Sequence, residues 1–297
     1  MKTIVVTGAG GYIGSQVVRE LAGRGVQVIA VDRSAGAGAD ETPGVRWVAA
    51  DLFDPLLDLC ELIGCVPDVC LHLAWRNGFA HNDESHMDDL SAHYRFLMNM
   101  ARAGVGQIAV MGTMHEVGYW EGAITADTPC NPQSLYGIAK NALRQGLALS
   151  LASMPVAFQW LRAFYIYGND EKAQSIFGKL LRAARAGDER FPFTTGKNLY
   201  DFITVEELAR QIATVVLQDK VTGVINCCTG APESLADRVE GFIRENGLSI
   251  ALDYGVFPDR PYDSPGVWGD ATEIRAIIMA SEGSSGTEGG RESDEVS

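Results

Sequence analysis

Residues 7–14 read TGAGGYIG, and they follow the apolar run Ile4-Val5-Val6. A short β-branched run of this kind is typical of a strand that is buried on both faces of a parallel sheet. After the glycines, apolar residues recur every three or four positions from Ile13 to Ala22, as on a helix that packs against a sheet. The sequence therefore predicts a strand, a glycine-rich turn and a helix, the dinucleotide-binding unit of a doubly wound α/β fold.

The glycines of this turn have separate predicted roles. Gly8 allows a tight turn, Gly11 lets the backbone approach a pyrophosphate, and Gly14 lets the helix pack closely on the strand. Phosphates would then meet the unpaired N–H groups at the helix N-terminus, beside Tyr12 and Ile13, where the helix dipole favours negative charge. The glycine pattern alone is also compatible with a purely structural turn.

An acidic residue follows at the spacing expected for ribose recognition. The second apolar run ends in Asp32, close to the expected ~20 residues beyond the glycines. A carboxylate there accepts hydrogen bonds from the adenosine ribose and repels a 2′-phosphate, so NAD is favoured over NADP, although Asp32 could also simply open a loop. Arg33 keeps NADP open, because a guanidinium can pair with that phosphate. Asp51 and Leu52, after the strand predicted at residues 46–50, are placed to cap the adenine pocket, although Asp is also common in turns.

A second signal lies far along the chain, where residues 136–140 read YGIAK. On a helix, residues four apart share a face, so the Tyr136 hydroxyl and the Lys140 ammonium are expected to be neighbours. A nearby cation lowers the pKa of a phenol from its usual value of about 10, which would make Tyr136 a usable general acid or base. The alternative is an ordinary surface Tyr and Lys pair.

These signals and three later segments resemble an extended short-chain dehydrogenase/reductase of the nucleotide-sugar epimerase and dehydratase group. The similarity runs from about residue 3 to residue 275. LHLA at residues 71–74 resembles "HLAA", a strand end that lines the nicotinamide side in that family. LRAFYIYG at residues 161–168 resembles "LRxFNVYG", and DFITVEELA at residues 201–209 resembles "RDFIHVDDLA".

The resemblance implies further site residues. Leu73 and Ala74 would line the nicotinamide side, and Trp75 is expected either to contact substrate or to pack the loop. The family usually places a hydroxyl residue beside the tyrosine, at a position that here falls on Met114. Thr113 is the only hydroxyl nearby, so it is assigned the role of holding the substrate oxygen, although a shift of one residue on an extended strand reverses the face.

In the family's 4,6-dehydratases, the next two positions carry an acid and a base, and here they are His115 and Glu116. Histidine in place of the usual aspartate argues against a standard dehydratase. His115 is equally compatible with a polar loop residue. Both are retained as candidate substrate-binding residues.

Three later positions bear on the substrate diphosphate. Tyr165 and Tyr200 stand where the family usually has Asn and Arg, so contacts to the diphosphate are expected to be rearranged, and Tyr165 is taken as a substrate-binding candidate. Arg260 resembles the family's diphosphate-binding arginine, for which bidentate pairing is the physical reason. A solvated loop arginine is the alternative.

Composition agrees with a globular enzyme. The chain has 297 residues, of which 46% are apolar and 21% charged, enough for one large core or a large and a small one. No apolar run is long enough to cross a bilayer, and Met1-Lys2 leads straight into a strand, so a cytoplasmic protein with no membrane association is expected. The formal charge of −14 makes nucleic acid an unfavourable partner.

The cysteines and histidines show no metal-binding spacing. The six cysteines fit no zinc motif and are expected to be reduced and buried. His81, His86 and His93 are five and seven residues apart, which fits no usual ligand motif, so no metal is expected. Their segment is predicted to be a loop and helix at the mouth of the cleft.

The order of strand and helix patterns predicts a Rossmann-type doubly wound parallel sheet with a smaller C-terminal substrate-binding lobe. We expect residues 1–165 and 200–227 to form the NAD(P)-binding domain, residues 166–199 and 228–280 the lobe, and residues 281–297 a disordered acidic tail.

The resemblance implies an NAD(P)-dependent oxidoreductase acting on a nucleotide-diphosphate sugar, by 4-keto reduction or 4-hydroxyl oxidation. A 4-epimerase is the next alternative, then a 4,6-dehydratase, and a non-catalytic dinucleotide-binding regulator is the hypothesis from another class. A homodimer is expected by analogy, through the apolar helix at residues 140–151.

Overall fold

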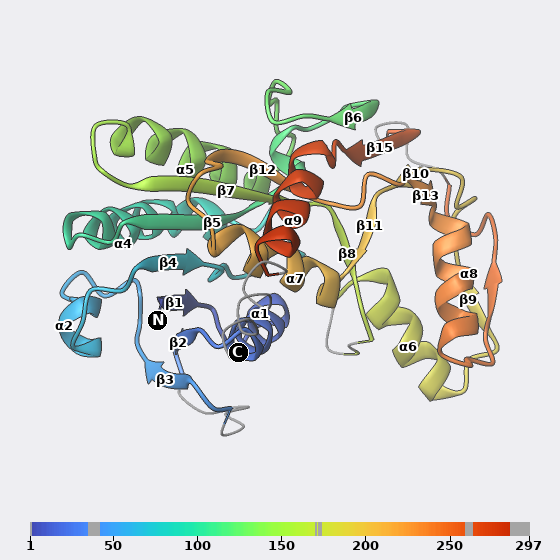
Figure 1. Cartoon of the computed structure of the whole chain (residues 1–297). Helices are drawn as coiled ribbons and strands as arrows, with labels where there is room; N and C mark the ends of the chain where they lie inside the picture. Colours follow the sequence, from blue (N-terminus) through green and yellow to red (C-terminus); the bar gives the residue numbers. More distant parts are fainter. Residues whose placement is uncertain (1, 35–41, 170, 172–173, 259–263, 286–297) are drawn as a thin grey trace, which may run out of the picture.

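A seven-stranded parallel sheet forms the centre of the molecule (Figure 1). The computed structural model describes residues 2–34, 42–169, 171, 174–258 and 264–285. The strand order of the central sheet is β12-β7-β5-β4-β1-β2-β3. The order reverses beside β1, and such a reversal opens a ligand crevice at the carboxyl ends of the strands. The strands are β1 (Thr3–Thr7), β2 (Gln27–Asp32), β3 (Val45–Ala49), β4 (Val69–His72), β5 (Gln107–Thr113), β7 (Ala157–Ala163) and β12 (Gly223–Cys227). The predicted doubly wound α/β fold is confirmed.

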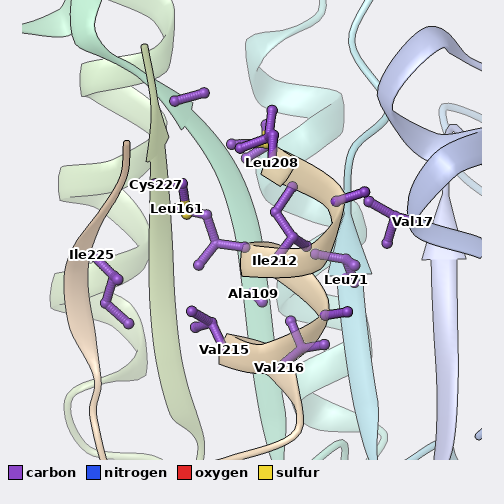
Figure 2. Packing of buried hydrophobic residues seen from close by; sticks show 14 of the residues in the cluster. Val17, Leu71, Ala109, Leu161, Leu208, Ile212, Val215, Val216, Ile225 and Cys227 are labelled. Carbon is purple, nitrogen blue, oxygen red and sulfur yellow. The ribbon is translucent and has the colours of Figure 1, made fainter. Parts of the chain in front are cut away.

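Alternation along the strands supplies two cores, one on each face of the sheet. Val6 and Leu71 belong to one cluster, whereas Val5 and Cys70 belong to the other, because successive side chains of a strand point to opposite faces. The first face is covered by α1 (Tyr12–Gly23), α7 (Val205–Val216) and α9 (Thr272–Ser285), and Figure 2 shows the apolar side of α7 on the sheet. The second face is covered by α2 (Leu59–Ile63), α4 (Leu90–Arg102) and α5 (Leu135–Leu151).

A smaller lobe has its own apolar cluster, which includes Phe177, Phe193 and Phe242. The helical patch predicted at residues 176–186 is α6 (Ile176–Ala186), and it packs in this cluster with α8 (Leu235–Glu245). The short strands of the lobe are β8 (Tyr165–Tyr167), β9 (Arg190–Pro192), β10 (Leu199–Tyr200), β11 (Phe202–Thr204), β13 (Glu233–Ser234), β14 (Ala251–Asp253) and β15 (Gly266–Gly269).

Several elements cross the boundaries that the sequence suggested. Phe202 of β11 packs in the cluster of the lobe, and α9 packs on the central sheet. β6 (Gly122–Ile124) comes from the first half of the chain but pairs with β15 in a four-stranded sheet. α9 extends to Ser285, into the segment predicted to be a tail, and residues 286–297 lie outside the described residues.

The cysteines differ in part from expectation. All six are free thiols, but Cys65 is exposed and Cys60 and Cys130 are only partly buried. Within the described part of the chain, no helix is both long and apolar enough to cross a membrane.

Candidate active site

The glycine turn between β1 and α1 leaves no room for side chains. A Cβ on Gly14 would lie 2.1 Å from the carbonyl oxygen of Gly8, and one on Gly8 would lie 2.7 Å from the Cα of Ala74. Gly8 also has a φ of +67°, which favours glycine. Gly11 caps α1 without a side-chain hydrogen bond, so the first N–H groups of the helix face the cleft. This bare backbone cradle fits a pyrophosphate.

The end of β2 completes the cradle. Oδ2 of Asp32 accepts a hydrogen bond from the Gly10 N–H at 2.9 Å, and Oδ1 accepts one from the Arg33 N–H at 2.7 Å. The carboxylate therefore lies beside the glycine turn, where a ribose hydroxyl can reach it. Asp51 and Leu52 line the same cleft. The residues present fit an NAD molecule.

The cleft has a volume of about 2020 Å³ and extends from the glycine turn to the smaller lobe. Single-ligand pockets usually measure about 300–1,000 Å³, so this cleft has room for a dinucleotide and a second ligand of similar size. Nearly all of the candidate site residues line it: Gly8, Gly11, Tyr12, Ile13, Gly14, Asp32, Arg33, Asp51, Leu52, Leu73, Ala74, Trp75, Thr113, His115, Tyr136, Lys140 and Tyr165. Arg260 lies outside the described residues.

The carboxyl end of β5 and the start of α5 bring Thr113 and Tyr136 together. The Thr113 hydroxyl is near enough to the Tyr136 hydroxyl to lower its pKa, and it accepts a hydrogen bond from the His115 N–H at 3.3 Å. This bond caps η1 (Met114–Glu116) and turns the chain away from the strand. Met114 instead packs in the apolar cluster on the first face of the sheet, at 5% exposure.

Close packing fixes Tyr136 above this turn. The Ser134 hydroxyl caps α5 by accepting from the Gly137 N–H at 3.2 Å, and the Tyr136 N–H donates to the His81 carbonyl at 2.8 Å. A Cβ on Gly137 would lie 2.4 Å from the carbonyl oxygen of His115. Glycine directly after the tyrosine is therefore what lets α5 approach η1.

The electrostatics of the tyrosine and lysine differ from the sequence expectation. Burial raises the pKa of Tyr136 to about 12, which outweighs the lowering effect of the Thr113 hydroxyl, and Glu116 raises it further. Burial also lowers the pKa of Lys140 to about 7. The expectation that the ammonium makes the phenol acidic is corrected for this state: the Lys140 Nζ is 5.9 Å from the centre of the Tyr136 ring, and desolvation is the larger effect on both groups.

Three of the chain's five histidines, His81, His86 and His115, lie around this tyrosine, which the sequence spacing did not reveal. Of the other two, His93 stacks on Trp75 and His72 contacts His93. The ring of His81 stacks on Tyr136 at 5.4 Å between centres and lies 4.4 Å from the ring of His115. Burial lowers the pKa values of His72 and His115 to about 3, so both are neutral. The sequence did carry one signal for this arrangement: His72 ends β4 and His115 follows β5, so both lie at the same edge of the sheet. No group of three or more His, Cys, Asp or Glu that could hold a metal is found among the described residues.

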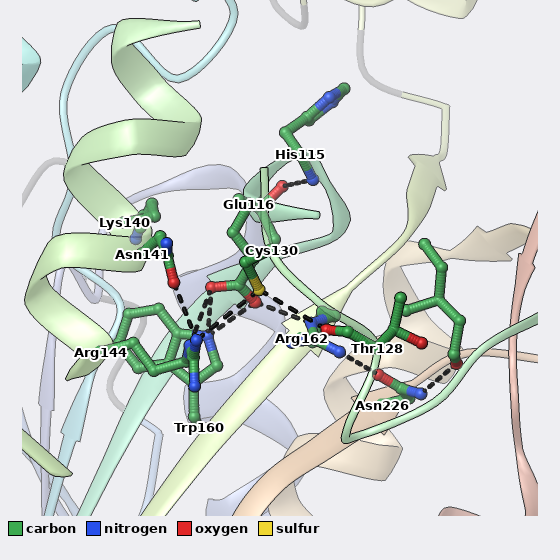
Figure 3. A network of polar contacts seen from close by, with 12 residues as sticks. His115, Glu116, Thr128, Cys130, Lys140, Asn141, Arg144, Trp160, Arg162 and Asn226 are labelled. Carbon is green, nitrogen blue, oxygen red and sulfur yellow. Dashed lines mark hydrogen bonds and ion pairs between the residues drawn. The ribbon is translucent and has the colours of Figure 1, made fainter. Parts of the chain in front are cut away.

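Glu116 does not face the cleft. Its carboxylate is fully buried and accepts hydrogen bonds from Nε of Arg162 at 2.7 Å and from Nε1 of Trp160 at 3.0 Å (Figure 3). This geometry corrects the expectation that Glu116 is a substrate-side base. Tyr165 lies against Tyr200 with ring centres 4.3 Å apart, and both line the cleft on the lobe side.

Comparison with known proteins agrees with this arrangement. The sequence model of the "NAD dependent epimerase/dehydratase family" matches residues 4–228. The dTDP-6-deoxy-L-talose 4-dehydrogenase (NAD(+)) of Aggregatibacter actinomycetemcomitans is 44% identical over 271 residues, which cover 90% of this chain and 98% of that protein. A UDP-glucose 4-epimerase of Lactobacillus helveticus is 24% identical over 94% of this chain and 91% of its own length. The solved structure of MoeE5 in complex with UDP-glucuronic acid and NAD has a TM-score of 0.77 and 26% identity, with coverage of 93% of this chain and 92% of that chain.

Proposed function

The chain belongs to the NAD dependent epimerase/dehydratase family, and we propose that it is the 4-dehydrogenase, or in reverse the 4-ketoreductase, of a dTDP-6-deoxyhexose. Action on the 4-position of a nucleotide-diphosphate sugar with NAD follows from the 44% identical relative, which matches over 98% of its length. The proposal is more specific in naming the thymine base and the 6-deoxy sugar, and both come from the name of that relative.

The glycine turn and Asp32 would hold NAD, which when bound supplies the hydride transfer that no side chain can perform. The hydroxyl of Tyr136 moves the proton at the sugar O4, and Thr113 donates a hydrogen bond to the same oxygen. With its pKa raised by burial, Tyr136 is protonated, the form that donates to a ketone oxygen. Proton removal from a 4-hydroxyl needs more positive charge beside the phenol, and Lys140 on the next turn of α5 is the nearest source.

The observation that carries the proposal is that Thr113, Tyr136 and Lys140 line one cleft with the glycine turn, and that this cleft has room for two ligands. Dehydration is disfavoured, because Glu116 is held in a buried ion pair with Arg162. Epimerisation is the second candidate, since a UDP-glucose 4-epimerase is among the relatives and uses the same position of the sugar.

The test is incubation of the purified protein with NAD and dTDP-6-deoxy-L-talose, with absorbance of reduced nicotinamide as the readout. Net formation of reduced cofactor is expected, and 6-hydroxylated and UDP-linked sugars should react more slowly. Formation of the 4-epimer without net reduction would make the enzyme an epimerase, and no reaction in a full panel of nucleotide sugars would reject both. Tyr136→Phe should bind NAD but lose about 10²–10⁴-fold in turnover. Tyr254→Phe, at an exposed tyrosine bonded to Glu240, is the matched control.

The proposal extends to organisation and location. We infer that residues 1–165 with 200–227 bind NAD, and that residues 166–199 with 228–280 form the substrate lobe. The support is that α6 and α8 share a separate apolar cluster, whereas α9 packs on the central sheet. Leu149 and Ile138 on α5 have exposed fractions of 81% and 40%. These apolar side chains support a homodimer through this helix, which sedimentation velocity would test.

A cytoplasmic enzyme is proposed because its substrate and cofactor are cytoplasmic metabolites, and cell fractionation would test it.

A further inference from the structure

Trp75 lies three residues beyond the end of β4 and lines the cleft beside the tyrosine and lysine. The Lys140 Nζ lies 3.9 Å from the centre of its ring. The ring of His93 stacks on it as well, with centres 4.3 Å apart and planes 9° from parallel. The ammonium of Lys140 and the imidazole of His93 therefore both contact the indole of Trp75.

The indole is also fixed at its edge. Its Nε1–H donates to Nδ1 of His86 at 3.0 Å, and Nε2 of His86 in turn donates to the Ala80 carbonyl at 3.0 Å. His93 is held from behind, because its Nδ1 is hydrogen-bonded to Nε2 of His72 at 2.8 Å. The ring therefore has a fixed position and orientation before any ligand binds.

Lys140 has few other partners. Its Nζ donates to the Met111 carbonyl at 2.7 Å, and its side chain is only 2% exposed. Among the described residues, no carboxylate forms an ion pair with it within 4.0 Å. An ammonium that is buried with one carbonyl needs another source of favourable electrostatics, and an indole face supplies it.

We propose that Trp75 is a positioning residue of the reaction, whose indole face holds the Lys140 ammonium one helical turn from Tyr136. This inference rests on the proposed function only for its consequence in turnover, since the contact exists in the protein without ligands. Trp75 then acts through Lys140, and need not contact the sugar.

The charged and titratable groups around Lys140 determine the direction in which its pKa shifts. Tyr136 lies on the same helix, Glu116 lies on η1 and raises the pKa of Lys140, and His72 and His93 lie on β4 and α4, near enough for Lys140 to lower their pKa values. Arg76 adds positive charge near His93. The two imidazoles are neutral, because burial and the nearby Lys140 both lower their pKa values. The indole is therefore the favourable group on that side.

Three substitutions separate the aromatic face from simple burial. Trp75→Phe keeps a face, Trp75→Leu keeps an apolar cover without a face, and Trp75→Ala admits water. The titration of Lys140 is measured by ¹³C NMR of the ligand-free protein labelled at lysine Cε, with its resonance assigned by its loss in Lys140→Met. The midpoint is expected to fall by about one pH unit in Trp75→Leu, to stay near the original in Trp75→Phe, and to rise in Trp75→Ala.

Turnover distinguishes positioning from substrate contact. In Trp75→Leu we expect kcat to fall about tenfold, with the KM for the sugar little changed and the pH profile displaced with the NMR midpoint. An unchanged midpoint in all three folded variants, or a raised KM with an unchanged midpoint, would overturn the inference. A displaced midpoint in a protein that turns over no nucleotide sugar would leave the lysine contact standing and reject the proposed function instead. Thermal unfolding of each variant checks that it is folded.

Discussion

The carboxylate of Glu116 and the guanidinium of Arg162 form an ion pair of 2.7 Å in which both side chains are fully buried. Arg144 adds a second cation, with its Nε 3.6 Å from the same carboxylate (Figure 3). The pair joins η1 to β7 beneath the cleft, so it supports the turn that carries Thr113. Its effect on the reaction is therefore expected to be through stability.

Glu116→Gln should destabilise the fold, and loss of its charge should lower the pKa values of Tyr136 and Lys140 while both groups stay in place. Removal of one charge leaves Arg162 buried without its partner, so the free energy of unfolding should fall by about 3 kcal/mol or more. Urea denaturation at neutral pH measures it. Glu121→Gln, at an exposed position, is the control and should change stability by less than about 0.5 kcal/mol. Full stability combined with lost turnover would return Glu116 to a chemical role.

Thr113→Val should slow turnover, because it removes the hydroxyl beside Tyr136 that lowers the pKa of the phenol. The expected loss in kcat is about tenfold, the rate equivalent of one hydrogen bond of about 1.4 kcal/mol. Met114→Leu, in the adjacent apolar cluster, should stay within about twofold because such swaps conserve volume. Steady-state kinetics on both variants decide which residue serves the tyrosine, and an equal loss in the two would contradict the assignment to Thr113.

Asp32→Asn should weaken NAD binding more than NADP binding. The change removes a charged acceptor beside the glycine turn and with it the repulsion of a 2′-phosphate, so affinity for NAD should fall about tenfold. Isothermal titration with both dinucleotides measures the ratio, and NADP serves as the internal control. A parallel loss for both would show that Asp32 only supports the turn through Gly10.

Acid should destabilise the protein from about pH 6.5 downwards, because His72 and His115 have folded pKa values of about 3 against 6.5 in the unfolded chain. The unfolded state binds more protons in this window, so the free energy of unfolding falls as the pH falls, by about 1.4 kcal/mol per pH unit for each histidine. Denaturation series between pH 7 and pH 4.5 should show a shallower slope for His72→Phe than for the original chain. An identical slope would mean that His72 does not take part.

Local sequence was sufficient for the frame of this protein. Apolar periodicity located β1, α1 and α6, because a strand or helix buries a face whose spacing is set by its own geometry. The spacing of Tyr136 and Lys140 placed both on one side of α5 for the same reason. The need for glycine at residue 14 could also be predicted, since it arises from the carbonyl of Gly8, six residues earlier.

Tertiary structure decided the electrostatics and the partners. Glu116 meets Arg162 across 46 positions of sequence, and His81, His86 and His115 converge on Tyr136 from a loop, a helix and the turn after β5. Burial, which no local pattern measures, reversed the expected direction of the phenol pKa. Spacing along a chain specifies which side chains share a face, whereas their charges and partners depend on what the rest of the fold packs against that face.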